Sequence, residues 1–554
     1  MTGQEVIACR DALKKTRQPL EQHWDELSAS FMPFSLMATG GIPDILSAKA
    51  VYDSTGRRAA LILANGLASL VIPREEIWFE YLAPAELRDD DDAVSFYRKA
   101  SETARENLEA SNFYEEGQEV LISSPVFGTA ALFCGDIDDH GEIHFRHQPI
   151  KTYYITEDAK GRVNGFYRDL SLTPDQAAGE FGADKLPETI RAKVGKAEGK
   201  TEPCMFVHAV FQRMEDPKPD APDKDKRPWV SLVVHEGSKE IVADDGYSEF
   251  PFAVHRYRRF GQCVWGFGPG TTACGDAHQL NFLNQLADVA AEKAVFPPVI
   301  APSSLEGEVA LGALEITYVD SNDPNSVASL KEWNTTSRYD VAKDRMADKR
   351  EQIERAFHVD LFQLFASRAG SSPLTATEAA YAAGEKLSQF SPVFGRLVSE
   401  MLDPVLTRVF AVLLRAGKFP NPPASVLRTI EAGRAGVATP SVLYKNRIML
   451  AMQARQNSSL MEYMQLAGPM LQVYPDAIDA LNMPVIVRDT ARNAGLLESW
   501  IRSKKEIEKM AADRAAARAQ QAQLEQAQAA SQVAKNIGGA PPQIQDQLGK
   551  QLPQ

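Results

Sequence analysis

Cysteine is scarce in this chain of 554 residues, and its five thiols are scattered. Their number is odd, and no two are separated by the two residues of a CxxC motif. Disulfide frameworks and zinc ribbons need paired cysteines at regular spacings. The pattern therefore favours buried thiols in a reducing cytoplasm over disulfides or zinc.

Long apolar runs are also missing. The run Ala59–Ile72 is interrupted by Asn65, Gly66 and Ser69, and it is shorter than the roughly 18 apolar residues of a membrane span. The N-terminus shows no basic region followed by an apolar one, so we expect neither a signal peptide nor membrane contact. Hydrophobic residues make up 44% of the chain and charged residues 24%, as in large proteins that fold into several domains.

The signatures of common enzymes are absent. The chain contains no GxxxxGK[ST], HExxH or GxSxG sequence. Gly266, Gly268 and Gly270 precede a helix, as the glycines of a phosphate loop do, but Thr271 breaks the GxGxxG register. A close-packed turn is the favoured interpretation of these glycines, and a nucleotide site is the alternative.

Three histidines, His140, His144 and His147, lie close together in HGEIHFRH. On a strand, His140 and His144 would face one side and His147 the other. No thiolate accompanies them at a fixed spacing, so a metal site is the weaker alternative to structural histidines. Carboxylates are abundant, but no pair stands out from the surface charge. The sequence therefore predicts no catalytic, cofactor-binding or metal-binding residues.

Basic residues are fewer than acidic residues, and the formal net charge of the chain is −14 at pH 7. Neutralisation of phosphates drives DNA affinity, so a protein that grips DNA would more often be basic. The acidic balance therefore argues against tight, non-specific DNA binding, although many enzymes share it.

Two long helices are predicted around a short insert. The first begins at Thr271 or Thr272 and ends at Pro297-Pro298, and the second runs from about Tyr339 to Phe365. The insert between them, residues 299–337, bears glycines, prolines and short β-type runs. Each helix carries an apolar stripe at helical spacing. The stripes consist of Leu280, Leu283, Ala287, Ala290 and Ala294 in the first helix and Met346, Ile353, Phe357, Leu361 and Leu364 in the second.

The chain before these helices divides by pattern at about residue 130. Residues 1–130 are predicted to be mostly helical, with Asp53 and Ser54 placed to cap one helix. The expected buried residues are Trp24, Leu27 and Phe31 in one helix and Ala60, Leu63, Leu67 and Leu70 in the next.

Residues 131–260 are predicted to form strands. Ile150–Ile155 and Arg162–Leu170 flank a turn that ends in Gly161, which is the pattern of a hairpin. Thr173-Pro174-Asp175-Gln176 has the cap, the N1 proline and the glutamine of a helix start. Further strands are expected at Met205–Arg213, Trp229–His235 and Phe250–Arg256, with an exposed loop over Asp216–Arg227.

A breaker sequence follows the second long helix, and Thr375 then opens a capping box. A third long helix should run to Ala416, with kinks at Pro392 and Pro404, because proline removes a backbone donor and collides with the preceding turn.

The C-terminal part is predicted to be helical as far as about residue 535. Residues 424–500 are expected to form helices with short breaks. Residues 501–535 have a helix-favouring composition but a thin apolar stripe, so that this helix would need neighbours for stability. Glycine, proline and glutamine predict disorder after it.

These patterns together resemble the head-to-tail connecting (portal) proteins of short-tailed bacteriophages. The resemblance extends from about Trp24 to Lys535. The matching stretches are YDSTGRRAALILANGLASLVIP with the following WFEY, the FP strand with GFGPG and a helix ending in AAEKAVFPP, and PLTATEAAYAAGEKLSQFSPVFGRLVSEMLDPVLTRVFAVLLRAGKFPNPP.

The resemblance implies an α+β, mainly α subunit of a portal ring. Its expected parts are a wing with a helical and a β-rich portion (1–265), a first stem helix (266–298), a small α/β clip (299–337), a second stem helix (338–367), a channel loop (368–374), a long kinked helix of the wing (375–423), a helical crown (424–500), a barrel-type helix (501–535) and a disordered tail (536–554).

The resemblance also implies sites that do no bond chemistry. For the channel loop, residues 368–374, the alternative is an ordinary interhelical turn with Arg368 in a surface ion pair. The expected sites are a stem core of Leu280, Leu283, Phe357 and Leu361, a DNA-contacting loop with Arg368, Gly370, Ser371 and Ser372, and a docking surface on the clip with Glu306, Gly307, Glu308 and Trp333.

As a portal subunit the chain would form a ring of about twelve copies at one capsid vertex, through which double-stranded DNA is packaged and ejected. The partners that the resemblance implies are the major capsid and scaffolding proteins, the terminase large subunit, the tail adaptor protein and, at the crown, internal core or ejection proteins. The protein would lie in the virion, and in the host cytoplasm during assembly. A cytoplasmic hydrolase with an unrecognised site is the alternative.

Overall fold

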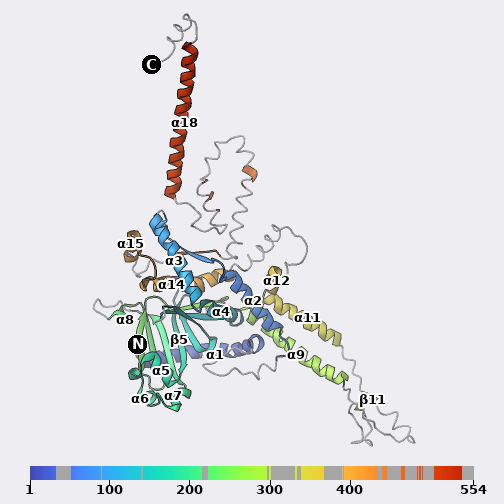
Figure 1. The fold of residues 1–554 in the computed structure, drawn as a ribbon. Helices are drawn as coiled ribbons and strands as arrows, with labels where there is room; N and C mark the ends of the chain where they lie inside the picture. Colours follow the sequence, from blue (N-terminus) through green and yellow to red (C-terminus); the bar gives the residue numbers. More distant parts are fainter. Residues whose placement is uncertain are drawn as a thin grey trace, which may run out of the picture. The chain divides into compact units, whose positions relative to one another are not determined.

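A computed structural model gives the fold, which is α+β and mainly helical, as predicted (Figure 1). The chain divides into two units, one with Met1–Tyr81, Lys99–Asn421 and Val442–Arg455 and one with Leu82–Arg98, Pro422–Ser441 and Gln456–Gln554. The described residues are 1–32, 51–88, 90–138, 141–214, 222–295, 299–300, 331–332, 339–366, 390, 392–432, 440–445, 463, 465–467, 483, 486–487, 490 and 504–538.

The first helices begin at side-chain caps. At α1 (Gly3–Phe31), the hydroxyl of Thr2 accepts a hydrogen bond from the Glu5 N–H, and the Glu5 carboxylate accepts one from the Thr2 N–H. At α2 (Thr55–Val71), the Asp53 carboxylate accepts from the Thr55 N–H at 2.8 Å, whereas the Ser54 side chain makes no cap. The apolar residues predicted for both helices are buried. The elements that follow are β1 (Phe79–Leu82), α3 (Asp91–Ala110) and α4 (Phe113–Phe127).

Two antiparallel sheets follow. The predicted hairpin is confirmed, and Gly161 closes its turn with a φ of +77° and an N–H that donates to the Asp158 carbonyl at 2.9 Å. The sequence did not predict β2 (Thr129–Ile137), β3 (Ile143–Gln148) or β8 (Ile241–Tyr247) individually. The sequence of β8, IVADDGY, is polar, and this strand lies at a sheet edge. The three-stranded sheet has the order β3 (Ile143–Gln148), β2 (Thr129–Ile137), β9 (Phe252–Arg256), and the five-stranded sheet has the order β4 (Tyr153–Glu157), β5 (Val163–Leu172), β6 (Cys204–Gln212), β7 (Trp229–His235), β8 (Ile241–Tyr247).

Helices cover both faces of the five-stranded sheet. Val6 and Ile7 of α1 are buried against one set of strand residues, which includes Val207. Phe206, the preceding residue, belongs to a second cluster on the opposite face with Ala177. The helices on this second side and in the β6–β7 connection are α5 (Pro174–Phe181), which has the predicted capping box, α6 (Glu188–Arg191), α7 (Ala197–Thr201) and α8 (Asp223–Lys226).

The second long helix differs from its prediction. It is broken into α11 (Tyr339–Ala356) and α12 (Val359–Ala366) by His358, which has a φ of +53°. The break directs α12 onto α2, where the Phe362 ring lies over Gly66. The first long helix, α9 (Pro269–Val295), is continuous.

The distortion expected at Pro404 is a π-helical turn, Val398–Leu402, immediately before α14 (Asp403–Arg415). The wider turn leaves room for the proline ring, which would collide with the carbonyl of residue 400 in a regular α-helix. The kink expected at Pro392 borders residues outside the described part.

The C-terminal part contains a strand where helix was expected. The prediction is wrong at β12 (Ser441–Tyr444), which pairs with β1, because pairing with a distant strand overrides local preference. The other described elements are β10 (Val299–Ile300), β11 (Lys331–Glu332), α15 (Ala424–Ala432) and α18 (Lys504–Gly538). The residues of α18 largely coincide with residues 501–535, for which a helix was predicted.

Candidate functional site

The helices α9 and α11 lie side by side and form the candidate site (Figure 1). Lys349 Nζ of α11 donates to Asp276 Oδ1 of α9 at 2.8 Å. Arg350 Nε of α11 donates to Asp53 Oδ2, in the turn before α2, at 2.9 Å. These ion pairs fix the helix pair to each other and to the N-terminal helices.

Asp53 joins three segments of the chain. Its Oδ1 accepts from the Thr55 N–H, and its Oδ2 accepts from Arg350 and from Asn284 Nδ2 of α9 at 3.3 Å. Burial opposes the charge of this carboxylate, but the hydrogen bonds from Thr55 and the guanidinium of Arg350 outweigh it and lower the pKa of Asp53. The charged side chain of Asp53 therefore links the start of α2 to both α9 and α11.

The four residues expected in the stem core have different environments. Leu280, Phe357 and Leu361 are buried, whereas Leu283 is half-buried. The Phe357 ring lies 5.2 Å from the ring of Phe31 at the end of α1. The core therefore extends from α9 to the break between α11 and α12 and includes α1.

A second apolar stripe lies on the exposed side of α9. Phe282, Leu286 and Val289 are 59%, 48% and 42% exposed and follow one another at helical spacing. We call these three residues the outer stripe. The sequence carries the signal, since α9 has apolar residues on more than one face and few charges, but only the buried stripe was predicted.

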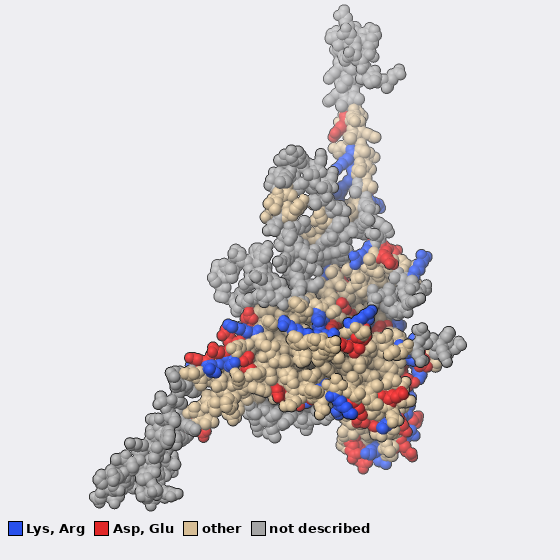
Figure 2. Space-filling model, turned by 180° about the vertical axis from the view of Figure 1, so that it is seen from behind, with Lys and Arg blue, Asp and Glu red and all other residues tan. Residues whose placement is uncertain are grey.

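The charges of the helix pair lie mainly on α11. Exposed side chains of both signs alternate along it, and Figure 2 shows them gathered over α11 while the neighbouring surface of α9 is largely uncharged. The helix pair thus presents a charged and an apolar surface next to each other.

The glycine turn before α9 is close-packed against the end of α4. A Cβ built at Gly268 would overlap the Pro125 carbonyl, and one at Gly266 would overlap the Gly128 carbonyl. The Gly266 N–H donates to Thr129 Oγ1 at 2.8 Å. The turn is therefore close-packed against α4 and its C-cap residue Gly128, which agrees with the favoured interpretation of these glycines.

A buried arginine connects the two sheets to the π-helical turn. Arg256, at the end of β9, contacts Glu157 of β4 at 2.9 Å through Nη1 and Glu400 at 2.7 Å through Nη2. Its Nη2 also donates to the Gly161 carbonyl at 2.9 Å. The sequence alone gave no sign of this network, because its members are far apart in the chain.

Arg408 of α14 makes a second buried network. Its Nε donates to the Cys134 carbonyl at 2.7 Å, and its Nη2 contacts Asp136 Oδ1 at 3.0 Å. Its Nη1 donates to the Glu249 carbonyl at 3.0 Å. A single arginine within the apolar sequence VLTRVFAVLL is the signal that would have identified it.

The residues expected in the channel loop and the clip lie outside the described part of the chain. They are Arg368, Gly370, Ser371 and Ser372 in the loop and Glu306, Gly307, Glu308 and Trp333 in the clip.

The histidine cluster does not converge in the described part of the chain. His140 lies outside it, His144 is exposed, and His147 is half-buried on the other face of β3. Burial lowers the pKa of His147 to about 4. All five cysteines are unpaired, with Cys134 and Cys274 buried and the others half-buried.

Among the described helices, none is both long and apolar enough to cross a membrane.

Comparison with known proteins gives consistent matches. The family model "Bacteriophage head to tail connecting protein" matches residues 3–501. The chain is 27% identical over 541 residues to the "Portal protein" of Salmonella phage epsilon15, covering 95% of this chain and 93% of that one. It is 25% identical over 476 residues to the "Probable portal protein" of Bordetella phage BPP-1, covering 84% and 83%.

Among solved structures, a chain of the "Virion of native gene transfer agent (GTA) particle" aligns with 78% of this chain and 91% of its own length. The identity is 10% and the TM-score 0.34, which is too low to support an argument about the fold.

The family model and both phage relatives indicate one role, that of the phage portal protein, and no finding favours the hydrolase alternative. The chain therefore belongs to the bacteriophage head to tail connecting protein family.

Proposed function

We propose that the chain is one subunit of a ring at a single vertex of the phage capsid, through which double-stranded DNA enters and leaves the head. Membership of the head to tail connecting family supports a structural role in the virion, in contact with capsid and DNA. The acidic net charge of −14 suits a passage that must let DNA slide.

The outer stripe on α9 is the structural observation that most supports the formation of a ring. Burying a large apolar side chain contributes roughly 1.5–3 kcal/mol relative to leaving it in water. Phe282, Leu286 and Val289 remain exposed although the opposite face of α9 is already packed. In a ring each subunit meets its two neighbours through different surfaces, so the outer stripe would pack against another face of the next copy.

The test is a charge in the middle of the stripe. Leu286→Lys should shift the particle mass, measured by mass photometry at equal protein concentration, from rings towards single chains. Leu286→Met is the matched control, because it keeps the apolar surface, and it should form rings as the wild type does. Rings of normal mass and abundance in Leu286→Lys would refute the role of the stripe.

The same proposal assigns α9 and α11 to the stem and residues 299–337 to the clip. The pairing of Val299 with Glu332 and of Ile300 with Lys331 supports this, because it brings the two ends of the insert together. The clip, with Glu306, Gly307, Glu308 and Trp333, would dock the terminase large subunit and then the tail adaptor protein. Deleting Glu306–Gly312 should leave rings intact and block DNA packaging or tail attachment; normal packaging and tails would contradict the assignment.

Residues 368–374 are proposed as the channel loop. Symmetry would present Arg368 about twelve times around the axis, giving weak phosphate contacts that do not depend on sequence. Replacing Arg368 by Ala and shortening Gly370–Ser372 should leave rings normal and change packaging or DNA retention. Wild-type packaging and retention in this variant would show an ordinary connector.

The remaining proposed partners are those of assembly. Major capsid and scaffolding proteins would surround the ring, which would form in the host cytoplasm before it becomes part of the virion. Residues 424–500 are proposed as the crown, where internal core or ejection proteins would dock, and α18 as a barrel-type helix. A chain truncated after Trp500 should still form rings, as seen by electron microscopy. Loss of all assembly would contradict the proposed role of α18.

A further inference from the structure

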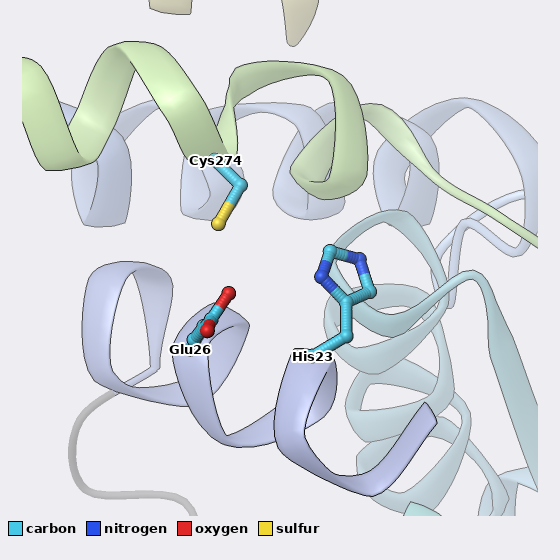
Figure 3. Close-up of side chains that lie close together, drawn as sticks. All are labelled: His23, Glu26 and Cys274. Carbon is cyan, nitrogen blue, oxygen red and sulfur yellow. The ribbon is translucent and has the colours of Figure 1, made fainter. Parts of the chain in front are cut away.

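Four side chains with metal-binding atoms meet where α1 faces the start of α9. His23 and Glu26 lie three residues apart on α1, and Cys274 and His278 lie four apart on α9, so each pair shares one helix face. Figure 3 shows the side chains of His23, Glu26 and Cys274 directed into the space between the two helices. Neither helix alone could place these groups together.

The ligand atoms of His23, Glu26 and Cys274 are close enough for one ion, and His278 lies next to Cys274. One atom from each of His23, Glu26 and Cys274 lies within 4.8 Å of the other two. The Cys274 Sγ is 3.9 Å from His278 Nε2. Tetrahedral zinc bonds of about 2.0–2.3 Å place neighbouring ligand atoms roughly 3.3–3.8 Å apart, so small side-chain rotations would complete the site.

The surroundings hold the imidazole in a suitable orientation. His23 Nε2 lies 3.2 Å from Thr271 Oγ1 of α9, which leaves Nδ1 on the side of Glu26 and Cys274 (Figure 3). A ligand histidine whose other nitrogen is hydrogen-bonded is the usual arrangement at metal sites. The rings of Trp24 in α1 and Trp265, in the segment that leads into α9, pack at 5.0 Å and hold these two parts of the chain together.

The charges also favour a cation. Among the described residues no lysine or arginine forms an ion pair with Glu26. A bound cation would stabilise the thiolate and would use the neutral imidazole as a ligand.

We propose that His23, Glu26, Cys274 and His278 bind a zinc ion that links α1 to the beginning of α9. Thiolate and imidazole donors select zinc over magnesium or calcium, which prefer oxygen ligands. The ion would connect the N-terminal helix to one helix of the candidate site and stabilise their contact. This inference does not depend on ring formation.

The experiment uses the full-length protein, loaded with zinc and then dialysed against buffer without metal. Wild type should retain about one zinc per chain by elemental analysis, and added zinc should raise its thermal midpoint. Cobalt(II) in place of zinc should give a thiolate-to-cobalt charge-transfer band. Cys274→Ser should lose the band and the bound zinc, while Cys263→Ser, which changes a half-buried thiol that is not in the cluster, should behave as the wild type does.

A second variant guards against misfolding of Cys274→Ser. His278 is exposed, so His278→Gln should fold normally and weaken zinc binding at least about tenfold. Absence of retained zinc in the wild type would overturn the proposal. Equal zinc retention in the wild type, Cys274→Ser and His278→Gln would overturn it as well.

Discussion

The carboxylate of Glu400 accepts three hydrogen bonds from Arg256, from the backbone N–H at 2.8 Å, from Nη2 at 2.7 Å and from Nε at 3.3 Å. Glu400 lies in the π-helical turn before Pro404, and Arg256 ends a strand of the three-stranded sheet. The pair is largely buried. It therefore ties the helical segment to the sheet at the place where the helix departs from regular geometry.

Removing this arginine should destabilise the protein strongly. Arg256→Met removes the guanidinium that pairs with Glu400, while Glu157 keeps its pair with Arg259, and breaking a buried ion pair costs about 3–5 kcal/mol. The urea midpoint should fall accordingly. The control is Arg162→Met, whose exposed pair with Asp158 should contribute little to stability because solvent screens it. Equal midpoints for the two variants would contradict the structural role of Arg256.

Two glycines in the same region should respond in opposite directions to alanine. Gly268→Ala places a methyl group against the Pro125 carbonyl and should cost about 1–3 kcal/mol, as overpacking does. Gly275 of α9 has nothing within 4 Å of its Cβ position, so Gly275→Ala should stabilise the helix by up to about 1 kcal/mol. Thermal midpoints of both variants test this; a neutral Gly268→Ala would show that the turn is not close-packed.

The buried apolar residues of the helix pair should be costly to truncate. Leu361→Ala removes a buried side chain and should cost about 2–5 kcal/mol. Leu283 is only half-buried, so Leu283→Ala should cost clearly less. Denaturant midpoints compare the two. If Leu361→Ala were no more costly than Leu283→Ala, the core would not extend through the break at His358.

Stability should decline in mild acid partly because of His147. Its pKa is lowered to about 4 by burial, whereas the unfolded imidazole has a pKa of about 6.5. The unfolded state therefore binds the proton more tightly. The contribution of the neutral imidazole to the stability of the protein is fully present above about pH 6.5 and is lost as the pH falls towards about 4.

The variant His147→Phe removes this titration and keeps an aromatic side chain. Its thermal midpoint should fall less than that of the wild type between about pH 6.5 and 4. His144→Phe, at an exposed position of the same strand, should keep the wild-type profile. Identical pH profiles for His147→Phe and the wild type would show that His147 does not contribute.

Local signals predicted much of the fold. The Thr173 cap, the hairpin turn at Gly161 and the buried stripe of α2 depend on residues a few positions apart, and all three are present. The break at His358 and the pairing of β12 with β1 depend instead on contacts with distant segments. Such contacts leave no local pattern in the chain.

The same distinction applies to the candidate site. The buried stripe of α9 was predicted from helical spacing. That the outer stripe stays exposed could not be predicted, because it depends on which side of α9 packs against α11. The grouping of His23 and Glu26 with Cys274 and His278 requires that two helices far apart in the sequence face each other.

The mass and shape of the full-length wild-type particle test the central claim most directly. Mass photometry together with negative-stain electron microscopy should show closed rings with a central opening, whose mass is an integer multiple of the chain mass. Single chains at every protein concentration, with no rings in the micrographs, would contradict the account.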